Sequence, residues 1–264
     1  MIDQFGRSVE YLRVSITDKC NLRCVYCMPL EGLPWLQRDE LLSYEEIEQI
    51  VRVMAPMGLE RLRITGGEPL VRRDVPELVR LLAAVPGIRD LSLSTNAVLL
   101  AEQADALKAA GISRLNVSLD SLREDRVDRI ARRPGSYPRI MEGLAAAEEV
   151  GFSPIKINVV LIKGENDDEI QDFAEITRKH PWHVRFIEMM PTGANLDLSA
   201  QQFISCTEVL HRVREIDKLE PVPGPFGNGP AEYYQFPGAP GTIGVITPMS
   251  HNYCDRCNRM RLTA

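Results

Sequence analysis

The chain of 264 residues contains 44% hydrophobic and 26% charged residues and has a formal net charge of −6, which is ordinary for a globular protein with a substantial core. No basic tail or basic block offsets the negative charge, and this excludes a general nucleic-acid binder. The N-terminus lacks the apolar core of a signal peptide, and no apolar run is long enough to span a bilayer. We therefore expect a cytoplasmic protein without a membrane partner, whose six cysteines bind metals rather than pair.

Strand and helix patterns alternate along the first 200 residues. Short apolar or alternating runs predict strands at residues 11–17, 61–65, 91–95, 114–120, 155–161 and 183–188. Periodic segments predict helices at residues 43–58, 75–84, 101–110 and 167–180, with further helical segments that reach residue 150. Strand–helix units in this order predict a parallel sheet, either open and doubly wound or curved into a partial barrel.

Polar and apolar residues alternate within these strands, and this pattern distinguishes a partial barrel from an open, doubly wound sheet. In residues 11–17, Leu12, Val14 and Ile16 share one face, and the other face is polar. A doubly wound sheet, covered on both faces, has near-continuous apolar strands instead. We therefore expect an incomplete (β/α)6 barrel of parallel strands, wide enough to hold a polar ligand in its interior.

The polar faces of the strands carry basic residues that should converge on this interior. They are Arg13, Arg61, Arg63, Lys156 and Arg185. Buried cations need counter-charges, and the few inward acids, chiefly Asp120, do not offset them. An anionic ligand would, and a triphosphate is the obvious candidate. The alternative is that some of these arginines cap strand ends or pair with helix carboxylates.

Three cysteines, Cys20, Cys24 and Cys27, follow the first predicted strand within eight residues. One tight loop can present all three thiolates to one inorganic centre, in the manner of iron–sulfur proteins. Three ligands leave one position of a four-site centre open, which is typical of catalytic rather than structural sites. A zinc site with a distant fourth ligand is an alternative, and a disulfide framework is disfavoured because one cysteine is left over.

The composition changes beyond residue 200. A capping box at Ser205 opens a short helix, and the Pro/Gly-rich residues 221–244 favour a loop or an irregular ribbon. Cys206, at the start of the helix, is expected to be a packing residue. We expect residues 1–200 to form the partial barrel and residues 201–264 a small, irregular metal-binding region.

A second cysteine pair, Cys254 and Cys257, lies near the end of the sequence. A lone Cys-x-x-Cys pair is moderately specific for a metal. Arg259 and Arg261 follow it directly. They indicate that an anion or a base edge is held near that metal.

The cysteine loop, with Tyr26 before its last cysteine, resembles that of the radical S-adenosylmethionine (SAM) superfamily, and Gly66-Gly67-Glu68-Pro69 is similar to the GGEP element of that superfamily. There, three cysteines hold a 4Fe–4S cluster, the methionine part of the cofactor chelates the fourth iron, and reductive cleavage gives a 5′-deoxyadenosyl radical. The resemblance implies that Cys20, Cys24 and Cys27 are the cluster ligands. The implied SAM contacts are Tyr26, Gly67, Ser118 and Met190.

The likeness to the GTP 3′,8-cyclase family covers essentially the whole chain. It is carried by Arg13, by residues 63–70, 116–120 and 185–188, and by the C-terminal cysteine pair with its arginines. It implies conversion of GTP to (8S)-3′,8-cyclo-7,8-dihydroguanosine 5′-triphosphate, the first step of molybdenum cofactor biosynthesis. The implied GTP contacts are Arg13, Arg63, Ser94, Lys156, Arg259, Met260 and Arg261, with Arg61 and Arg185 as further triphosphate contacts.

The resemblance also implies a second 4Fe–4S cluster, bound by Cys254, Cys257 and a third cysteine. The third cysteine and the two terminal glycines of the family are absent from this sequence, so we expect a piece of a longer protein, the alternative being a family member that cannot complete the second cluster. The implied partners are GTP, an external one-electron reductant and, downstream, pyranopterin monophosphate synthase, and a homodimer is compatible with the sequence. Ser94 replaces the more common Thr, and Ala97 the usual Gly.

Two other functions stay open at this point. One is a different radical SAM enzyme with an auxiliary cluster, for example one that modifies peptides, which predicts a more open cavity with fewer inward cations. The other is a non-catalytic nucleotide-binding protein with zinc at Cys20, Cys24 and Cys27.

Overall fold

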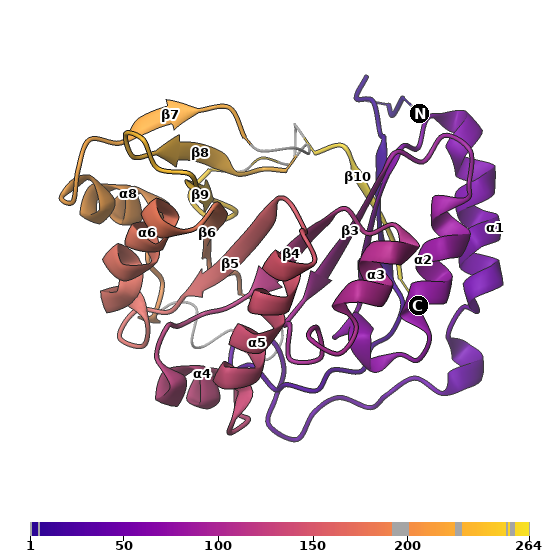
Figure 1. Ribbon diagram of the computed structural model, residues 1–264, viewed down its shortest axis with the longest axis horizontal. Helices are drawn as coiled ribbons and strands as arrows, with labels where there is room; N and C mark the ends of the chain where they lie inside the picture. Colours follow the sequence, from indigo (N-terminus) through magenta and orange to yellow (C-terminus); the bar gives the residue numbers. More distant parts are fainter. Residues whose placement is uncertain are drawn as a thin grey trace.

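A sheet of mostly parallel strands forms the centre of the molecule in a computed structural model, which describes residues 2–4, 6–191, 201–224, 229–251, 253 and 257–263, except for the side chain of Arg38. Within these residues the sheet has ten strands in the order β10-β1-β2-β3-β4-β5-β6-β9-β8-β7 (Figure 1). The strand directions turn progressively across the sheet, as expected for a twisted, partly closed barrel.

The first six strands confirm the predicted alternation of strands and helices. They are β1 (Tyr11–Ser15), β2 (Arg61–Thr65), β3 (Asp90–Thr95), β4 (Arg114–Ser118), β5 (Ile155–Leu161) and β6 (Trp182–Glu188). Each pairs in parallel with the next. Strands β1 and β4 each end two residues before the predicted boundary.

Helices follow the strands and pack against their neighbours: α1 with α2, α2 with α3, α3 with α5, α5 with α4, and α6 with α8. Their bounds are α1 (Tyr44–Met54), α2 (Val75–Ala83), α3 (Ala104–Ala110), α4 (Glu124–Ala131), α5 (Ser136–Glu149), α6 (Ile170–Lys179) and α8 (Cys206–Arg214). Short 3-10 turns are η1 (Arg38–Glu40), η2 (Ala55–Met57), η3 (Pro69–Val71) and η4 (Asp167–Glu169). Both predicted N-caps are present: Ser43 closes a capping box, and Ser205 accepts a hydrogen bond from Glu208 N.

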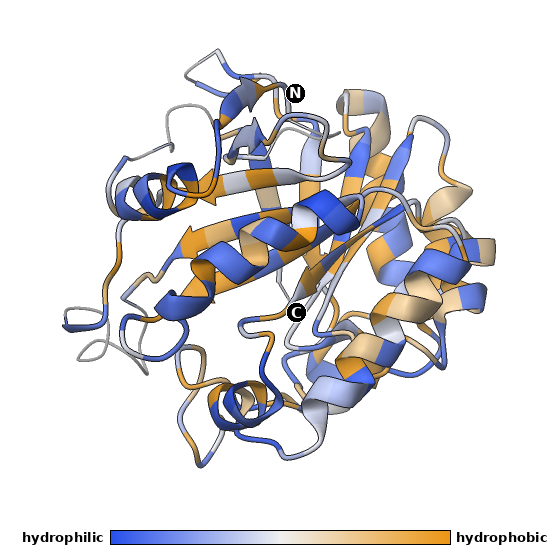
Figure 2. Cartoon of the chain, turned by 60° about the vertical axis from the view of Figure 1, so that its left-hand side comes forward, coloured by the Kyte–Doolittle hydropathy of each residue, from blue (hydrophilic) through white to orange (hydrophobic). Residues whose placement is uncertain are grey.

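The hydrophobic core lies between this helical layer and the apolar face of the sheet. Leu12, Val14 and Ile64 from the strands are buried with Val51 and Leu82 from the helices. Apolar residues concentrate on the strands and on the helix sides that face them (Figure 2). The other face of the sheet is polar, as the alternation predicted. Among the described helices, none combines the length and apolar character that crossing a bilayer requires.

The residues beyond position 200 add strands to both edges of the sheet. They are β7 (Glu220–Val222), β8 (Glu232–Gln235), β9 (Thr242–Ile246) and β10 (Arg259–Leu262). β7 and β8 form an antiparallel ribbon, β9 joins β6 in parallel, and β10 joins β1 in parallel. Composition predicted the ribbon but not the two parallel strands. The division into two domains at residue 200 stays a prediction.

Candidate active site

The cysteine loop begins where β1 ends, at the carboxyl edge of the sheet, and two neighbouring segments hold its backbone. The N–H groups of Arg23 and Val25 donate to the carbonyl groups of Ala131 and Ile130, each at 2.9 Å, at the end of α4. On the other side, Gly67 N donates to Thr17 O at 2.7 Å. A Cβ atom on Gly67 would lie 2.4 Å from Lys19 O, so only glycine permits this approach.

The three thiols of the loop differ in exposure: Cys20 and Cys24 are partly buried, and Cys27 is exposed. Burial raises the pKa of all three thiols, and the negative charge of Asp120 adds to this effect at Cys24 and Cys27. Such thiols ionise readily only beside a positive centre. Among the described residues, no group of three His, Cys, Asp or Glu side chains closes on a single ion. Three thiolates on one loop suit a cubane, because each would bind a different iron.

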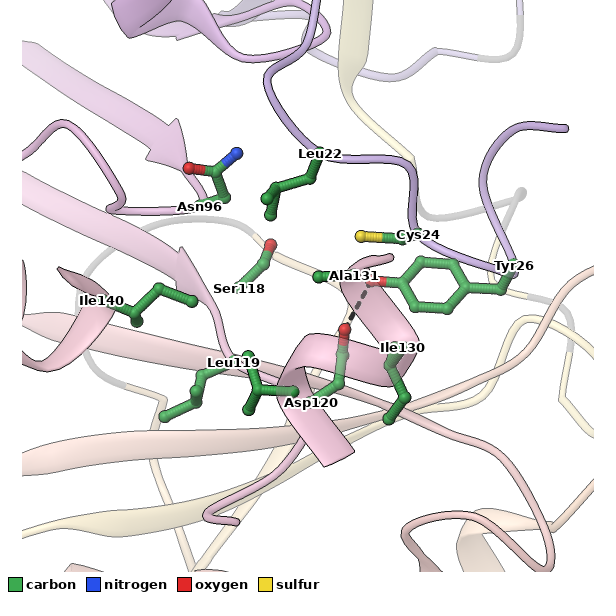
Figure 3. A pocket seen from close by; sticks show the side chains of 11 residues that line it. Leu22, Cys24, Tyr26, Asn96, Ser118, Leu119, Asp120, Ile130, Ala131 and Ile140 are labelled. Atoms are coloured by element: carbon green, nitrogen blue, oxygen red, sulfur yellow. Dashed lines mark hydrogen bonds between the residues drawn. The ribbon is translucent and has the colours of Figure 1, made fainter. Parts of the chain in front are cut away.

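A pocket lies directly behind Cys24 (Figure 3), where Tyr26 from the same loop meets Ser118 and Asp120 at the end of β4. The Tyr26 hydroxyl donates to Asp120 Oδ2 at 2.7 Å, and Val160 N donates to Asp120 Oδ1 at 2.8 Å. Burial raises the pKa of Asp120 to about 6. The remaining wall is mostly apolar and is formed by Leu22, Asn96, Leu119, Val127, Ile130, Ala131 and Ile140.

Glu68, the acidic residue of the Gly-Gly-Glu-Pro element, is buried and holds two loops together. Its carboxylate accepts hydrogen bonds from Thr95 Oγ1 at 2.8 Å, Asn96 N at 2.6 Å and Leu70 N at 3.1 Å. Burial raises its pKa to about 7. Asn96 in turn donates to Asn21 Oδ1 in the cysteine loop at 2.7 Å. Sequence reasoning did not assign this role, although a carboxylate between two loop motifs could have suggested it.

A second, larger cavity opens on the polar face of the sheet and, with its mouth, encloses about 1030 Å³. All five inward cations that the alternation predicted line it, together with Ser94, Met190, Arg259 and Arg261. The register explains this convergence: Arg261, Arg13 and Arg63 are direct partners across β10, β1 and β2. Ser118 of the first pocket pairs in register with Asn158, which lines this cavity, so the two sites adjoin.

The cations of this cavity are buried beside one another. Burial, followed by repulsion from Arg185, lowers the pKa of Lys156 to about 6, and burial lowers that of Arg63 to about 9. Nε of Arg13, Nη1 of Arg61 and Nε of Arg185 are buried without a hydrogen-bond partner among the described residues. Buried donors are normally satisfied, so these atoms point to an anionic ligand.

Sequence reasoning missed several members of this cavity, among them Arg114 and Tyr11. Arg114 is held by a two-point ion pair with Asp90, whose Nε–Oδ1 distance is 2.8 Å. It shares the inward face of β4 with Asn116, and this parity could have identified it. The guanidinium of Arg63 lies 5.3 Å from the centre of the Tyr11 ring, a cation–π contact that needs the folded sheet to be seen.

The C-terminal cysteine pair is only partly visible, because Cys254 lies outside the described residues. Cys257 lines a small pocket with Tyr253 and Arg259 that adjoins the cationic cavity. Partial burial opposes ionisation of Cys257, but hydrogen bonds from Arg259 bring the pKa of this thiol below its ordinary value. The Met260 side chain packs against the hydrophobic core.

Cys206 is buried, and its sulfur lies 3.4 Å from Ile246 O, in agreement with the predicted packing role.

Comparison of the sequence with known proteins identifies the family of the chain. Residues 14–176 match the Radical SAM superfamily, and residues 182–264 match Molybdenum Cofactor Synthesis C. The GTP 3′,8-cyclase of Petrotoga mobilis is 50% identical over 100% of this chain and 81% of its own length. That of Moorella thermoacetica is 48% identical, again over 100% and 81%. The chain thus spans about four fifths of these relatives.

Solved structures give the same fold. Streptococcus suis SuiB bound to its precursor peptide SuiA is 20% identical, with a TM-score of 0.61 over 79% of this chain and 45% of SuiB. The radical SAM enzyme coproporphyrinogen III oxidase of Escherichia coli is 19% identical, with a TM-score of 0.54 over 79% of this chain and 52% of that one. The match to the superfamily and the identity to the curated relatives show that the chain belongs to the radical SAM superfamily and, within it, to the GTP 3′,8-cyclase family.

Proposed function

We propose that this chain catalyses the radical cyclisation of GTP to (8S)-3′,8-cyclo-7,8-dihydroguanosine 5′-triphosphate, the first step of molybdenum cofactor biosynthesis. The observation that carries this proposal is the cationic cavity, in which buried arginine donors have no partner in the described chain, next to a pocket formed by a cluster-type cysteine loop. A nucleoside triphosphate supplies both the charge and the acceptors that this cavity lacks.

Each pocket has its own task in the proposed reaction. When bound, the cluster and SAM would supply the radical chemistry that joins C3′ of GTP to C8 of guanine. Cys20, Cys24 and Cys27 hold the cluster at the carboxyl edge of the sheet. Tyr26, Gly67, Ser118 and Met190 contact SAM, and the apolar wall behind Cys24 excludes water from it.

The cationic cavity holds and orients the substrate. Arg13, Arg63 and Lys156 bind the triphosphate, with Arg61 and Arg185 as further phosphate contacts and Ser94 as a hydroxyl contact. Charge-assisted contacts at several points fix the ribose with C3′ facing the first pocket. Arg259 and Arg261 point from β10 into the cavity and contact the guanine end of the substrate, whereas Met260, whose side chain packs against the core, would contact it through its backbone.

A second 4Fe–4S cluster is part of the proposal, with Cys254 and Cys257 as two of its ligands. The low pKa of Cys257 beside Arg259 supports a thiolate there. Residues 201–264 would then form the region for the second cluster, and residues 1–200 the region for the first. The proposed partners are an external one-electron reductant and, downstream, pyranopterin monophosphate synthase. A second copy of the chain, in a homodimer, is a further proposed partner.

The two other functions fit the described residues less well. A peptide-modifying enzyme predicts few inward cations, whereas eight arginine and lysine side chains line the cavity. Zinc held by Cys20, Cys24 and Cys27 is disfavoured because residues 14–176 match the Radical SAM superfamily.

Calorimetric titration with GTP, GDP, GMP and guanosine tests the substrate assignment. Affinity should fall stepwise along this series, because each lost phosphate removes charge-assisted contacts. Equal affinity for guanosine and GTP would overturn the assignment. Anaerobic incubation with SAM, GTP and dithionite should yield 5′-deoxyadenosine and the cyclised nucleotide together, and 5′-deoxyadenosine formation that requires a peptide instead of GTP would favour the peptide-modifying enzyme.

A further inference from the structure

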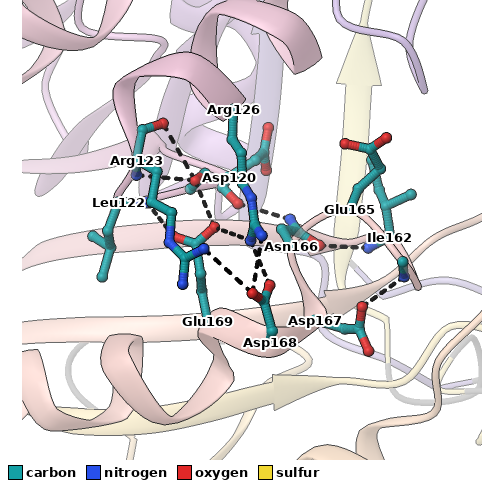
Figure 4. A network of polar contacts seen from close by, with 12 residues as sticks. Asp120, Leu122, Arg123, Arg126, Ile162, Glu165, Asn166, Asp167, Asp168 and Glu169 are labelled. Carbon is teal, nitrogen blue, oxygen red and sulfur yellow. Dashed lines mark hydrogen bonds and ion pairs between the residues drawn. The ribbon is translucent and has the colours of Figure 1, made fainter.

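Many arginine side chains outside the cationic cavity are paired with carboxylates of the chain. Between α4 and η4, Arg126 Nη1 lies 2.8 Å from Glu169 Oε1 and also pairs with Asp168 (Figure 4). Arg123 contacts the same aspartate at 3.4 Å. Pairs of this kind balance the positive charge within the chain and need no ligand. The charges of the cationic cavity are balanced in another way.

The wall of the cationic cavity presents positive charge and hydrogen-bond donors. Eight arginine and lysine side chains line it, and no aspartate or glutamate is among the described residues of its lining. Of these arginines, only Arg114 forms an ion pair with a described carboxylate, that of Asp90. Buried polar atoms without a partner in the described chain belong to Arg13, Arg61, Arg185 and Tyr11. A guanidinium is a donor only, so this wall is built to meet acceptor oxygens.

Two carboxylates beside the cavity are not part of its lining, and neither faces the predicted phosphate contacts. Asp90 binds Arg114 through both oxygens, with an Oδ1–Nε distance of 2.8 Å, and also accepts from Ser113 Oγ at 3.2 Å. Glu232 is exposed and lines the adjoining pocket together with Cys257. Mg²⁺ in nucleotide sites is usually held by one or two carboxylates together with the phosphates. The described lining of the cavity supplies no such carboxylate.

The amide oxygens on this face of the sheet are occupied as well. Those of Asn116 and Asn158 both accept from Arg185 Nη2, the first at 2.8 Å. Mg²⁺ on a triphosphate occupies phosphate oxygens and keeps several water ligands. The protons of these waters point outward and would face guanidinium groups, which can only donate. The metal would therefore remove acceptors that the cavity needs and add donors where it already has an excess.

We propose that the cavity binds GTP as the metal-free triphosphate and that Mg²⁺ competes with the protein for the phosphate oxygens. The inference rests on the proposed function, because it takes GTP as the ligand. The arginine and lysine side chains then have the role that Mg²⁺ has in other nucleotide sites. They neutralise the phosphates through charge-assisted hydrogen bonds, which are strongest to oxygens that carry their full charge.

Calorimetric titration of the anaerobically prepared protein with GTP, over a series of MgCl₂ concentrations, tests this inference. Once the nucleotide is saturated with Mg²⁺, the apparent Kd for total GTP should rise about tenfold for each tenfold increase in free Mg²⁺, because only the metal-free fraction binds. KCl keeps the ionic strength constant along the series, so that screening does not change. SAM, which has no phosphate, is the control ligand, and its affinity should not depend on Mg²⁺.

A chromium(III) complex of GTP provides a second measurement, because its metal does not leave the phosphates during a titration. This complex should bind about tenfold or more weakly than metal-free GTP. Equal affinity for the two would overturn the proposal, and so would an apparent Kd for GTP that stays constant or falls as Mg²⁺ rises. An equal loss of SAM affinity would also overturn it, because Mg²⁺ would then act on the protein and not on the nucleotide. Absence of GTP binding without any metal would instead count against the proposed function.

Discussion

The pocket behind Cys24 and the cationic cavity are neighbours on one sheet, but they differ in whether the chain itself supplies hydrogen-bond partners for their buried charged groups. In the first, the carboxylates of Glu68 and Asp120 are occupied by donors from the chain itself. In the second, buried nitrogens of Arg13, Arg61 and Arg185 have no partner among the described residues. The first region is therefore assembled before any ligand arrives, whereas the second becomes satisfied only when a substrate binds.

The largest effect is expected at the preassembled pocket. Replacing Cys24 with Ala leaves two thiolates on the loop, too few to hold a cluster with one open iron. We expect 5′-deoxyadenosine formation to fall below detection and the iron content to drop. Cys206→Ala is the matched control, because that thiol packs in the core and should retain both iron and activity. A normal rate in Cys24→Ala would show that the loop is not the catalytic centre.

Substitutions in the cationic cavity should weaken the binding of the substrate. Arg63→Ala and Lys156→Ala each remove a charge-assisted phosphate contact of about 1.5–3 kcal/mol, so GTP should bind about tenfold to a hundredfold more weakly. SAM affinity should change much less, which calorimetry with each ligand alone can measure. Arg80→Ala removes a surface arginine paired with Glu77 and is the control. If both variants weakened SAM and GTP alike, the two regions would not be separate sites.

Lys156 should also make GTP binding dependent on pH. Its pKa is lowered from an ordinary 10.5 to about 6, so the free folded protein holds this amine neutral near pH 7.5. A triphosphate favours the charged amine, so binding should take up a proton, and affinity should weaken about tenfold from pH 7.5 to pH 9. Calorimetry in buffers of different ionisation enthalpy measures the uptake. Lys156→Ala should abolish it, and uptake that persisted in this variant would assign the proton to another group.

The lowered pKa of Lys156 also affects the stability of the ligand-free protein, which should rise with pH where the affinity for GTP falls. Between about pH 6 and pH 10.5 the unfolded chain binds a proton at Lys156 that the folded chain does not. This residue therefore makes the folded state more stable as pH rises through that window. Thermal unfolding without ligand should show a contribution of this sign that is absent from Lys156→Ala.

The smallest effect is expected at the Tyr26–Asp120 hydrogen bond. Tyr26→Phe removes one of two donors to a buried carboxylate and should lower the free energy of unfolding by about 1–3 kcal/mol. Tyr44→Phe is the matched control, since the Tyr44 hydroxyl donates to the carbonyl of Arg73 in an exposed setting. Chemical denaturation measures both. Equal losses in the two variants would mean that Asp120 does not depend on its tyrosine partner.

Much of the fold and the cavity could be predicted, because a strand places alternate residues on opposite faces. This rule put Arg13, Arg63 and Lys156 on one side before any tertiary information was used, and all three line the cavity. The motif loops also follow from local sequence. Their assigned ligands and cofactor contacts stay predictions.

The features that could not be predicted from the sequence depend on contacts between residues far apart in the chain. The four residues of β10 alternate arginine with Met260 and Leu262, which is too short a pattern to identify a strand without β1 beside it. Glu68 looks like part of a cofactor motif, yet its hydrogen bonds to Thr95 and Asn96 exist only after β2 and β3 pair. Strand pairing decides such roles, and the composition of a segment does not specify which strand it pairs with.

The pairing of β10 with β1 has a consequence for the order of folding. Tyr11 leaves the ribosome long before its partner Arg259 is made. Until then β1 is an edge strand with unsatisfied backbone groups. Pairings between such distant residues form slowly, because a long loop must close first. The wall that carries Arg13 and leads into the cysteine loop is therefore completed late, after the helices and central strands have already formed a core.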